Sequence, residues 1–479
     1  MMFGYKRLYI AGELRDARDG ARQTVICPGT EEPVAEVAWA GTTDAEEALA
    51  AAAKGFQQWS RLSLNDRTEW LHKLRSAVQE KQDLLRDSVM HEMGKPWEAT
   101  QEDFDTVVSA LSFYPDEMLR MRGELLPDAD GTFDHQIVYE PAGVVVAILA
   151  WNFPLLNLGF KLGPALAAGC SLILKPSPKA PLSAYVFAEI CAEMGFPAGA
   201  VNVLCGPDDS VGTTLTASPI PAVLTLIGST QTGAKVMQQG ATSIKRYSME
   251  LGGNAPVLVF DDADLDLAAD TVAALKFGNC GQICVAPNRV FLQRGIAENF
   301  THGILARARE VRLGFGRDSG ATMGPLVDEQ ARQRVGDLVR DAVQGGAELL
   351  AGGDRPDAPD RGYFFQPTVL RGITPDMRIF REEIFGPVVS LLEFDDEDEA
   401  IRQANDTEAG LASYLFTRDL GRVQRVSSAL RFGEVQVNGF KYGIDLPHGG
   451  LKQSGMGHDC SHLALLDYLD KKRITMARR

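Results

Sequence analysis

The chain lacks any hydrophobic run long enough to cross a membrane. Its longest clean apolar stretch, residues 142–151, covers about half of the ~20 residues that a spanning helix needs. The N-terminal segment has neither the long apolar core of a secretory signal nor the Arg- and Ser-rich composition of a transit peptide. These absences predict a cytoplasmic protein with no membrane partner.

Basic residues are too few to outweigh the acidic ones. Lys and Arg number 48 and Asp and Glu number 64, which gives a formal net charge of −16 at pH 7. Because an acidic surface repels polyanions, this composition excludes a general attraction for nucleic acid or for an anionic membrane surface.

The cysteines and histidines do not form the patterns of a disulfide framework or a metal site. The seven cysteines are scattered and odd in number, which is typical of reduced thiols. Cys280 and Cys284 form one Cys-x-x-x-Cys pair without a second pair, and the seven histidines are isolated. We therefore predict that the protein holds no metal.

The sequence does contain an alternation of helical and extended segments. Its 479 residues exceed one compact domain. Helical spacing of apolar side chains covers residues 43–59, opened by the capping box Thr43-Asp-Ala-Glu46, and residues 71–94. Short apolar runs typical of strands follow, with helical segments between them, at 144–149, 171–174, 201–204, 223–227 and 257–260, and a second block spans 290–437. The alternation predicts an α/β fold built on parallel sheets.

Three further segments complete the predicted organisation. Residues 123–140 read as an extended hairpin with Asp130-Gly131 as its turn. The acidic clusters 261–264 and 395–399 each precede a helix-like run, so we interpret them as helix caps, with a metal site as the alternative. Since no low-complexity linker separates the blocks, we expect interleaved domains.

A glycine-containing turn joins a predicted strand to a predicted helix at Gly228-Ser-Thr-Gln-Thr-Gly233. Backbone amides at such a junction can approach a phosphate at the positive end of the helix. The spacing is G-x-x-x-x-G, which is neither the dinucleotide fingerprint nor a P-loop. The motif alone is therefore also compatible with a tight structural turn.

Three polar residues stand where chemistry is possible. Cys284 follows a helical stretch on a glycine-containing loop, where an exposed thiol can be reactive, although a buried structural cysteine is the alternative. Glu250 lies in an apolar segment, so it is either a paired structural acid or a general base with a raised pKa. Asn152 ends a predicted buried strand, where a helix cap is the simple explanation.

Together with their neighbours these segments resemble one family, and the resemblance covers nearly the whole chain. The motifs that carry it are Trp151-Asn-Phe-Pro154, Gly163-Pro-Ala-Leu-Ala-Ala-Gly169, Lys175-Pro-Ser177, Gly228-Ser-Thr-Gln-Thr-Gly233, Glu250-Leu-Gly-Gly253, Gly281-Gln-Ile-Cys284, Glu382-Glu-Ile-Phe-Gly-Pro387 and Gly449-Gly-Leu-Lys-Gln-Ser-Gly455. Their order and spacing are similar to those of NAD(P)-dependent aldehyde dehydrogenases. The resemblance implies oxidation of an aldehyde to the free carboxylic acid.

The resemblance also implies catalytic roles. Cys284 would attack the aldehyde to form a thiohemiacetal and then a thioester, with Asn152 and the backbone N–H of Cys284 holding the oxyanion. Glu250 would activate the water that hydrolyses the thioester. Lys161 and Asp459 match positions linked to proton relay, although relatives usually carry Glu in place of this Asp.

For the cofactor, the resemblance implies NAD, with some tolerance of NADP. NAD-preferring relatives often carry a Glu after the Lys175-Pro-Ser177 motif, and this chain has Pro178 and Lys179 instead, so the electrostatic barrier to a 2′-phosphate is missing. The residues that match cofactor-contacting positions are Trp151, Lys175, Ser177, Pro178, Gly228, Ser229, Gly233, Glu383 and Phe385.

The substrate is expected to be an apolar aliphatic or aromatic aldehyde. Relatives that oxidise succinate semialdehyde carry two Arg residues where this chain has Phe160 and His458, so a carboxylate would lose its partner. Phe153, Asn157 and Phe160 would line the tunnel. The alternatives are a semialdehyde or an aminoaldehyde, the latter because the segment 446–459 resembles aminoaldehyde-oxidising relatives.

Other function classes are less well supported by these residues. A CoA-acylating dehydrogenase typically lacks the acid that matches Glu250, and a thiol esterase needs a histidine beside Cys284. A non-catalytic scaffold does not explain why Asn152, Glu250 and Cys284 are all intact.

The resemblance further implies a Rossmann-like cofactor domain (1–122 with 142–251), a catalytic domain (252–453) and a small β arm for oligomerisation (123–141 with 454–479). A homodimer or homotetramer is expected, because pairing across subunits protects an exposed hairpin edge.

Overall fold

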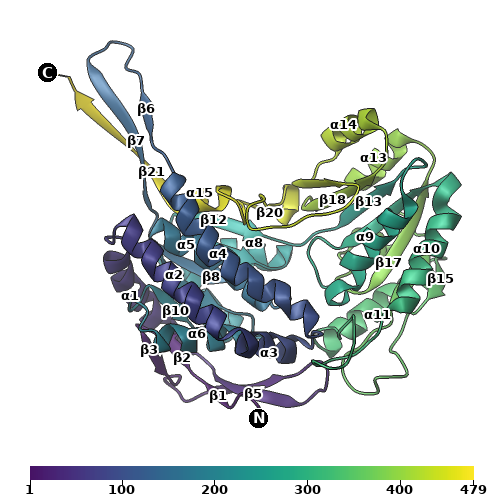
Figure 1. Cartoon of the computed structure of the whole chain (residues 1–479), viewed down its shortest axis with the longest axis horizontal. Coiled ribbons are helices and arrows are strands. Elements are labelled where there is room, and N and C mark those ends of the chain that lie inside the picture. The colour runs from purple at the N-terminus through teal and green to yellow at the C-terminus, as the bar shows by residue number, and fades with distance from the viewer. Residues whose placement is uncertain (479) are drawn as a thin grey trace.

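The structure, a computed structural model, describes residues 1–478 and contains two large sheets surrounded by helices (Figure 1). Most neighbouring strands in both sheets run parallel. The predicted α/β class is therefore confirmed. Among the described residues, no helix combines the length and the apolar composition needed to cross a membrane.

The first sheet has eight strands, and its central ones are buried on both faces, as crossover helices require. In spatial order the strands are β20 (Gly455–Met456), β12 (Arg246–Glu250), β11 (Pro221–Ile227), β8 (Val144–Ile148), β9 (Ser171–Lys175), β10 (Val201–Val203), β2 (Leu8–Ile10) and β3 (Glu13–Arg15). The chain adds α1 (Thr42–Trp59), α2 (Leu64–Glu80), α3 (Gln82–Met93), α4 (Gln101–Arg120), α5 (Pro154–Ala168), α6 (Leu182–Glu193), α7 (Thr213–Ala217) and α8 (Thr230–Gly240).

The second sheet has seven strands with a separate hydrophobic core. In order they are β15 (Glu348–Ala351), β16 (Thr368–Arg371), β17 (Val388–Phe394), β14 (Pro287–Gln293), β13 (Ala255–Val259), β18 (Ala412–Phe416) and β19 (Glu434–Val437). Its helices are α9 (Leu265–Phe277), α10 (Ala297–Glu310), α11 (Glu329–Gln344), α12 (Arg378–Arg381), α13 (Glu397–Asn405) and α14 (Leu420–Ala429). The five strands predicted from apolar runs all lie within these two sheets.

Two small sheets complete the chain. Strands β1 (Tyr5–Lys6), β5 (Pro33–Ala38) and β4 (Arg22–Ile26) form one of them. The other is an arm that projects from the body of the molecule (Figure 1) and consists of β6 (Glu124–Leu126), β7 (Phe133–Pro141) and β21 (Leu469–Ala477), which follows the short α15 (Leu463–Asp467). The predicted hairpin is confirmed, but Asp130-Gly131 is only part of a longer loop between β6 and β7.

Two predicted helix boundaries are wrong. Helix α1 begins after Gly41, whose backbone N–H donates to the carboxylate of Asp44 at 3.0 Å, so the capping box does not involve Thr43 and Glu46. The apolar periodicity expected to run from 71 to 94 belongs to two helices, α2 and α3, that meet at Lys81. Periodicity alone did not reveal that break, because it continues on both sides.

The acidic clusters act as helix caps. The Asp264 carboxylate accepts a hydrogen bond from the backbone N–H of Leu267 at the start of α9. In the same way, the Asp396 carboxylate accepts from the backbone N–H of Glu399 at the start of α13. Asp262 instead binds Thr417 and pairs with Arg422 at 2.9 Å. Within residues 1–478, no group of three or more His, Cys, Asp or Glu residues is arranged to hold a metal ion.

Candidate active site

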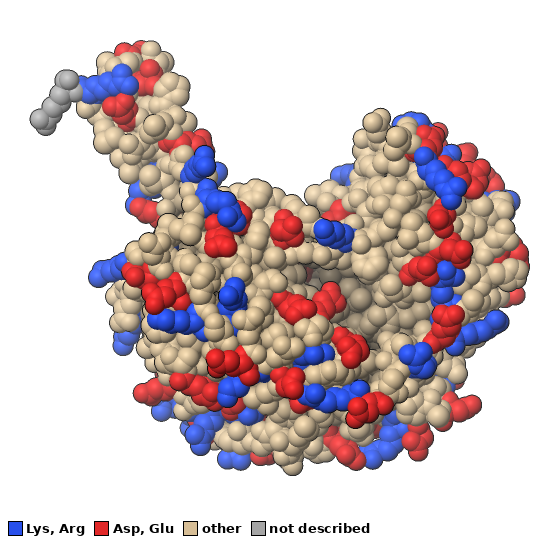
Figure 2. Space-filling view, viewed as in Figure 1, with Lys and Arg blue, Asp and Glu red and all other residues tan. Residues whose placement is uncertain are grey.

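A cleft of about 1880 Å³ lies between the two large sheets. Figure 2 shows this face of the molecule hollowed between its two halves. The segments that follow β8, β11 and β12 line one side, so the cleft opens at the carboxyl ends of parallel strands. That is where ligands bind in open α/β sheets.

Cys284 reaches the cleft because the chain before it is forced into an unusual turn. Asn279, Cys280 and Gly281 all have positive φ, and a Cβ on Gly281 would lie 2.2 Å from the carbonyl oxygen of Gly386. Cys284 is partly exposed in the cleft, whereas the other six cysteines are buried. The alternative of a buried structural cysteine therefore does not apply to Cys284.

Asn152 is tied to the loop that carries Cys284. Its side-chain Nδ2 donates to the carbonyl oxygen of Gln282 at 3.0 Å, which uses one of its two hydrogens. Its Oδ1 accepts from Asn157 at 3.4 Å, and its own carbonyl accepts from Asn279 at 2.9 Å. The residue at the N-cap of α5 is Phe153, so the interpretation of Asn152 as a helix cap is wrong.

Glu250 is the last residue of β12 and is only 4% exposed. Neither of its carboxylate oxygens has a hydrogen-bond partner, so Glu250 is not the paired structural acid of the alternative interpretation. Burial raises the pKa of this carboxyl well above its usual range, while the neighbouring His448 opposes that rise. A buried acid without a partner at a cleft wall is suited to exchange a proton with a bound water or ligand.

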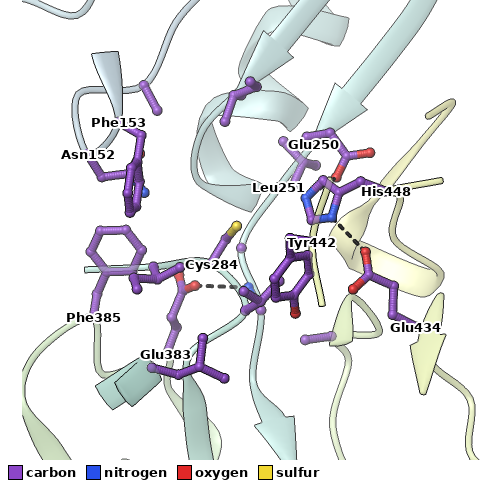
Figure 3. Close-up of a pocket in the computed structure, with 18 of the residues that line it drawn as sticks. Asn152, Phe153, Glu250, Leu251, Cys284, Glu383, Phe385, Glu434, Tyr442 and His448 are labelled. Atoms are coloured by element: carbon purple, nitrogen blue, oxygen red, sulfur yellow. Dashed lines mark hydrogen bonds and ion pairs between the residues drawn. The ribbon is translucent and has the colours of Figure 1, made fainter. Parts of the chain in front are cut away.

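His448 was not predicted as a site residue, yet it lies between Glu250 and Glu434 (Figure 3). Its Nδ1 is 2.6 Å from Glu434 Oε1, and its Nε2 is 3.8 Å from Glu250 Oε2. His448 belongs to the Pro447-His-Gly-Gly segment beside a recognised motif, but no local pattern links it to β19, which carries Glu434. Only the folded chain brings them together.

Lys161 and Asp459 form a buried ion pair behind the cleft wall. Lys161 Nζ lies 2.6 Å from Asp459 Oδ1 and 2.9 Å from Oδ2. The shorter Asp side chain therefore still reaches this lysine. Asp459 borders the cleft, and its charge also contributes to the raised pKa of Glu250.

The opposite end of the cleft is lined by aromatic rings and a strand-to-helix turn. The rings of Trp151 and Phe385 meet edge to face with centroids 5.5 Å apart. Ser229 caps α8 by accepting from the backbone N–H of Thr232 at 3.2 Å, and Gly228 precedes it at the cleft wall. Gly233 lets the helix pack closely against Leu251, because a Cβ there would lie 2.7 Å from the Leu251 side chain.

Glu383 also lines this end. Its Oε1 accepts from the backbone N–H of Gly253 at 2.9 Å (Figure 3), and burial raises its pKa to about 7. The turn of α8, the aromatic pair and this carboxylate together can hold an extended molecule that carries phosphates, ribose hydroxyls and flat rings.

Most of the predicted site residues meet at this one cleft, and some do not. The residues that line it are Trp151, Asn152, Phe153, Asn157, Phe160, Gly228, Ser229, Glu250, Cys284, Glu383 and Phe385. Outside its lining lie Lys161, Lys175, Ser177, Pro178 and Gly233. Lys175 ends β9 and pairs with Asp208, and Lys179 pairs with Asp328 at 2.6 Å.

Near Cys284 the cleft wall is aromatic and contains two acids but no unengaged Arg. Phe160, Phe440 and Tyr442 contribute rings to it. The two arginines that line the cleft are bound elsewhere: Arg334 donates to the carbonyls of Glu383 and Ile384, and Arg381 pairs with Asp406. His458 is exposed and lies outside the lining.

Comparison with known proteins gives consistent results. Residues 15–474 match the model of the aldehyde dehydrogenase family. The chain is 39% identical to a 3-sulfolactaldehyde dehydrogenase of Pseudomonas putida over 98% of this chain and 97% of that one. It is also 39% identical to the NADP-dependent succinate-semialdehyde dehydrogenase of Escherichia coli, over 97% and 96% of the two chains.

Solved structures agree with the sequence matches. A crystal structure of an NADP-dependent enzyme of E. coli superposes with a TM-score of 0.97 at 37% identity, covering 99% of this chain and 98% of that one. The betaine aldehyde dehydrogenase of Staphylococcus aureus in complex with NAD+ has a TM-score of 0.95 at 34% identity, over 98% and 94% of the two chains.

Proposed function

The chain belongs to the aldehyde dehydrogenase family, and from this premise we propose how its residues oxidise an aldehyde to the free acid with NAD(P). The observation that carries the proposal is the convergence of Cys284, Asn152 and Glu250 on one cleft. Each of these side chains comes from a different segment, and each presents a group that the reaction needs.

Cys284 is the nucleophile in this proposal. Its sulfur attacks the aldehyde carbon, and the resulting oxyanion is held by the free Nδ2 hydrogen of Asn152 and by the backbone N–H of Cys284. Glu250 then removes a proton from the water that hydrolyses the thioester. Lys161 and Asp459 behind it relay protons away from Glu250.

The cleft suits a nicotinamide dinucleotide, which supplies hydride acceptance when bound. We assign Trp151, Lys175, Ser177 and Pro178 to the adenosine half from the family resemblance, and Gly228, Ser229 and the start of α8 to the pyrophosphate. Glu383 can accept hydrogen bonds from ribose hydroxyls, and Phe385 packs against the nicotinamide side.

The test of this function is acid formation without CoA. Purified protein with NAD and an aldehyde should release one carboxylic acid for each reduced cofactor, and Cys284→Ala should lose both products. Acid formation that requires CoA would contradict the proposal. Ester hydrolysis without any cofactor reduction would indicate a thiol esterase instead.

We propose an apolar aliphatic or aromatic aldehyde as substrate. The aromatic wall near Cys284 favours it. The described lining residues include Lys441 but no unengaged Arg, so the carboxylate or sulfonate that the similar enzymes' substrates carry would lack a bidentate partner. In a panel of hexanal, phenylacetaldehyde and succinate semialdehyde, kcat/KM should be lowest for the anionic compound. A preference for succinate semialdehyde would contradict the proposal.

One observation favours an aminoaldehyde as second candidate. Glu434 is half-buried and its Oε2 has no hydrogen-bond partner, so it can accept from a substrate ammonium group. Adding 4-aminobutyraldehyde to the panel separates the two candidates. An advantage over hexanal that disappears in Glu434→Gln would favour the aminoaldehyde.

For the cofactor we propose NAD with tolerance for NADP, because Pro178 leaves no acid next to the 2′ position. A kcat/KM ratio above roughly a thousandfold in favour of NAD would contradict this tolerance.

We propose the cofactor domain, catalytic domain and arm given above, a homodimer or homotetramer formed through the arm, and a cytoplasmic location. Exposed apolar side chains on the arm support the assembly. Size-exclusion chromatography with light scattering tests it, and cell fractionation tests the location.

A further inference from the structure

Asn157 is a buried residue in the first turn of α5, at the wall of the cleft. Its Nδ2 donates to the carbonyl oxygen of Ala150 at 3.2 Å and to Oδ1 of Asn152 at 3.4 Å, which is one bond for each of its hydrogens. Because a carbonyl oxygen can only accept, the nitrogen of the Asn157 amide, and not its oxygen, faces Ala150. The side chain therefore ties the turn before α5 back to the helix.

The carboxamide of Asn152 is bonded at both of its ends. Its Nδ2 donates to the carbonyl oxygen of Gln282 at 3.0 Å, and its Oδ1 accepts from Asn157. An amide turned by half a rotation would set its oxygen against the Gln282 carbonyl and its nitrogen against the Asn157 nitrogen. Both contacts would then join like groups, so the two partners select one orientation. In that orientation one Nδ2 hydrogen stays free, and Asn152 lines the cleft together with Cys284 (Figure 3).

The two partners of this amide belong to separately anchored segments. Gln282 is fully buried, its Oε1 accepts from the backbone N–H of Val327 at 2.9 Å, and its Nε2 donates to the carbonyl oxygen of Pro325 at 3.3 Å. These bonds hold the loop that carries Cys284 without any help from Asn157. Loss of the Asn157 amide would therefore act on the oxyanion donor and leave the nucleophile in place.

The helix that carries Asn157 is itself held close to α4. A Cβ on Gly159 would lie 3.0 Å from the Cα of Val107, a backbone atom that cannot turn aside. The carboxylate of Asp103 on α4 accepts from the backbone N–H of Leu156 at 3.3 Å, which ties the first turn of α5 to the same helix. Asn157 thus orients its neighbour from a rigid element, as a group that supports a catalytic side chain must.

We propose that Asn157 is a positioning residue for aldehyde oxidation, which holds the Asn152 carboxamide with its free N–H toward the oxyanion. When the electron pair of the Cys284 thiolate bonds to the aldehyde carbon, the carbonyl π pair moves onto oxygen, and this oxygen accepts from that N–H. A donor fixed in advance stabilises the developing charge without reorienting at the moment of reaction. The proposal deepens the proposed function, because it rests on Asn152 as an oxyanion donor.

The size of the expected effect follows from the contacts of the amide. Loss of a whole oxyanion donor costs about 10²- to 10³-fold in rate. The bond from Asn157 is long, at 3.4 Å, and Gln282 still holds the other end of the Asn152 amide when that bond is lost. We therefore expect only part of that factor, about three- to tenfold.

Two other roles would place Asn157 at the same wall of the cleft. A side chain that contacts the aldehyde would favour some aldehydes over others. A side chain that only packs would change stability and would affect every variant alike. Neither of these roles depends on the amide of Asn152, and this difference allows the three roles to be separated.

Four forms of the enzyme test the proposal: the unmodified chain, Asn157→Leu, Asn152→Ala and the double variant. Rapid mixing with saturating NAD gives the second-order rate constant of cofactor reduction in a single turnover, for hexanal and for phenylacetaldehyde. We expect Asn157→Leu to lower this constant about three- to tenfold in the unmodified chain, by the same factor for both aldehydes. In the Asn152→Ala background the same substitution should change it by less than about twofold, because the group it holds is gone.

Leu156→Ala is the matched control. Leu156 lies in the same turn of α5 and lines the same cleft, but its apolar side chain cannot bond to the Asn152 amide. Its effect on the rate constant should therefore be the same with and without the Asn152 amide. A dependence on Asn152 as large as that of Asn157→Leu would overturn the proposal.

Equal factors for Asn157→Leu in the two backgrounds also overturn it, as does a loss confined to one of the two aldehydes. If Asn157→Leu does not fold, as judged by thermal unfolding, Asn157→Asp decides by the same criterion. Aspartate has nearly the same shape, but it sets a carboxylate oxygen against the two acceptors, Ala150 and Asn152. An unmodified enzyme that oxidises no aldehyde would instead contradict the proposed function.

Discussion

At the scale of single residues, burial works against the ionised forms of both Cys284 and Glu250. Both groups have pKa values raised by burial, and both must lose a proton to act. His448 opposes both rises, and its Nδ1 lies 2.6 Å from Glu434 Oε1. The pKa values of both groups are therefore influenced by a histidine that no local sequence pattern identifies.

Glu250→Gln should separate hydride transfer from hydrolysis. A burst of reduced cofactor, one per active site, should remain, while steady-state turnover falls about 10²- to 10⁴-fold because no base activates water. In the unmodified enzyme, turnover limited by hydrolysis should fall as pH drops through the raised pKa of Glu250, since the acid must be ionised to accept a proton. Rapid-mixing kinetics across pH measures both, and full turnover in Glu250→Gln would assign the base elsewhere.

Asp208→Asn should increase the use of NADP. Asp208 pairs with Lys175 and so offsets a positive charge at the predicted adenosine end of the cleft. Without this acid, Lys175 can face a 2′-phosphate, and we expect the NADP to NAD ratio of kcat/KM to rise about three- to tenfold. Asp209→Asn, one residue along, is the control; an equal change there would indicate a general charge effect.

At the scale of elements, glycines set the distance between the segment after β12 and the loop of Cys284. A Cβ on Gly253 would lie 2.2 Å from the carbonyl oxygen of Cys284, which is backbone and cannot rotate away. Gly281 has φ of +70° and faces another backbone carbonyl. The position of the nucleophile is therefore fixed by backbone approach on two sides.

Gly253→Ala should displace the Cys284 loop. We expect a loss of about 1–3 kcal/mol in the free energy of unfolding, with aldehyde oxidation reduced more than the stability change explains. Gly295→Ala is the control, because nothing lies within 4 Å of its added Cβ, and it should change stability by less than about 0.5 kcal/mol. Thermal unfolding and activity measure both variants; equal behaviour would contradict the packing argument.

Local sequence predicted the elements better than their junctions. The central strands were predictable because they are buried on both faces and read as continuous apolar runs. The start of α1 was not predictable in this way, because Asp44 is also held by distant residues. It accepts from the backbone N–H of Arg18 at 3.3 Å and pairs with Arg15 at 3.2 Å. Tertiary partners of this kind, like those that join His448 to Glu434, have no signature in neighbouring residues.

At the scale of the whole molecule, the arm exposes apolar side chains. Leu125 is 80% exposed on β6, and Phe133 on β7 and Met476 on β21 are 40% and 43% exposed. A sheet with exposed apolar groups and free edges is suited to pairing with another subunit.

Leu125→Glu should weaken the proposed assembly. The charge would be buried without a partner at the interface, so the mass measured by light scattering should fall toward that of one chain, 52.0 kDa. Leu420→Glu is the control, because Leu420 on α14 is equally exposed at 80% but lies outside the arm. A mass unchanged by Leu125→Glu would place the interface elsewhere.

The last strands of the chain also determine when folding can finish. β20 covers the edge of β12 in the first sheet, and β21 pairs with β7 along nine residues of the arm, although β12 and β7 are made much earlier. During translation both partner strands therefore keep open edges until β20 and β21 have left the ribosome. A chain that stops before β20 would leave two strands without these partners, β12 in the first sheet and β7 in the arm, so both sheets depend on segments made late in synthesis.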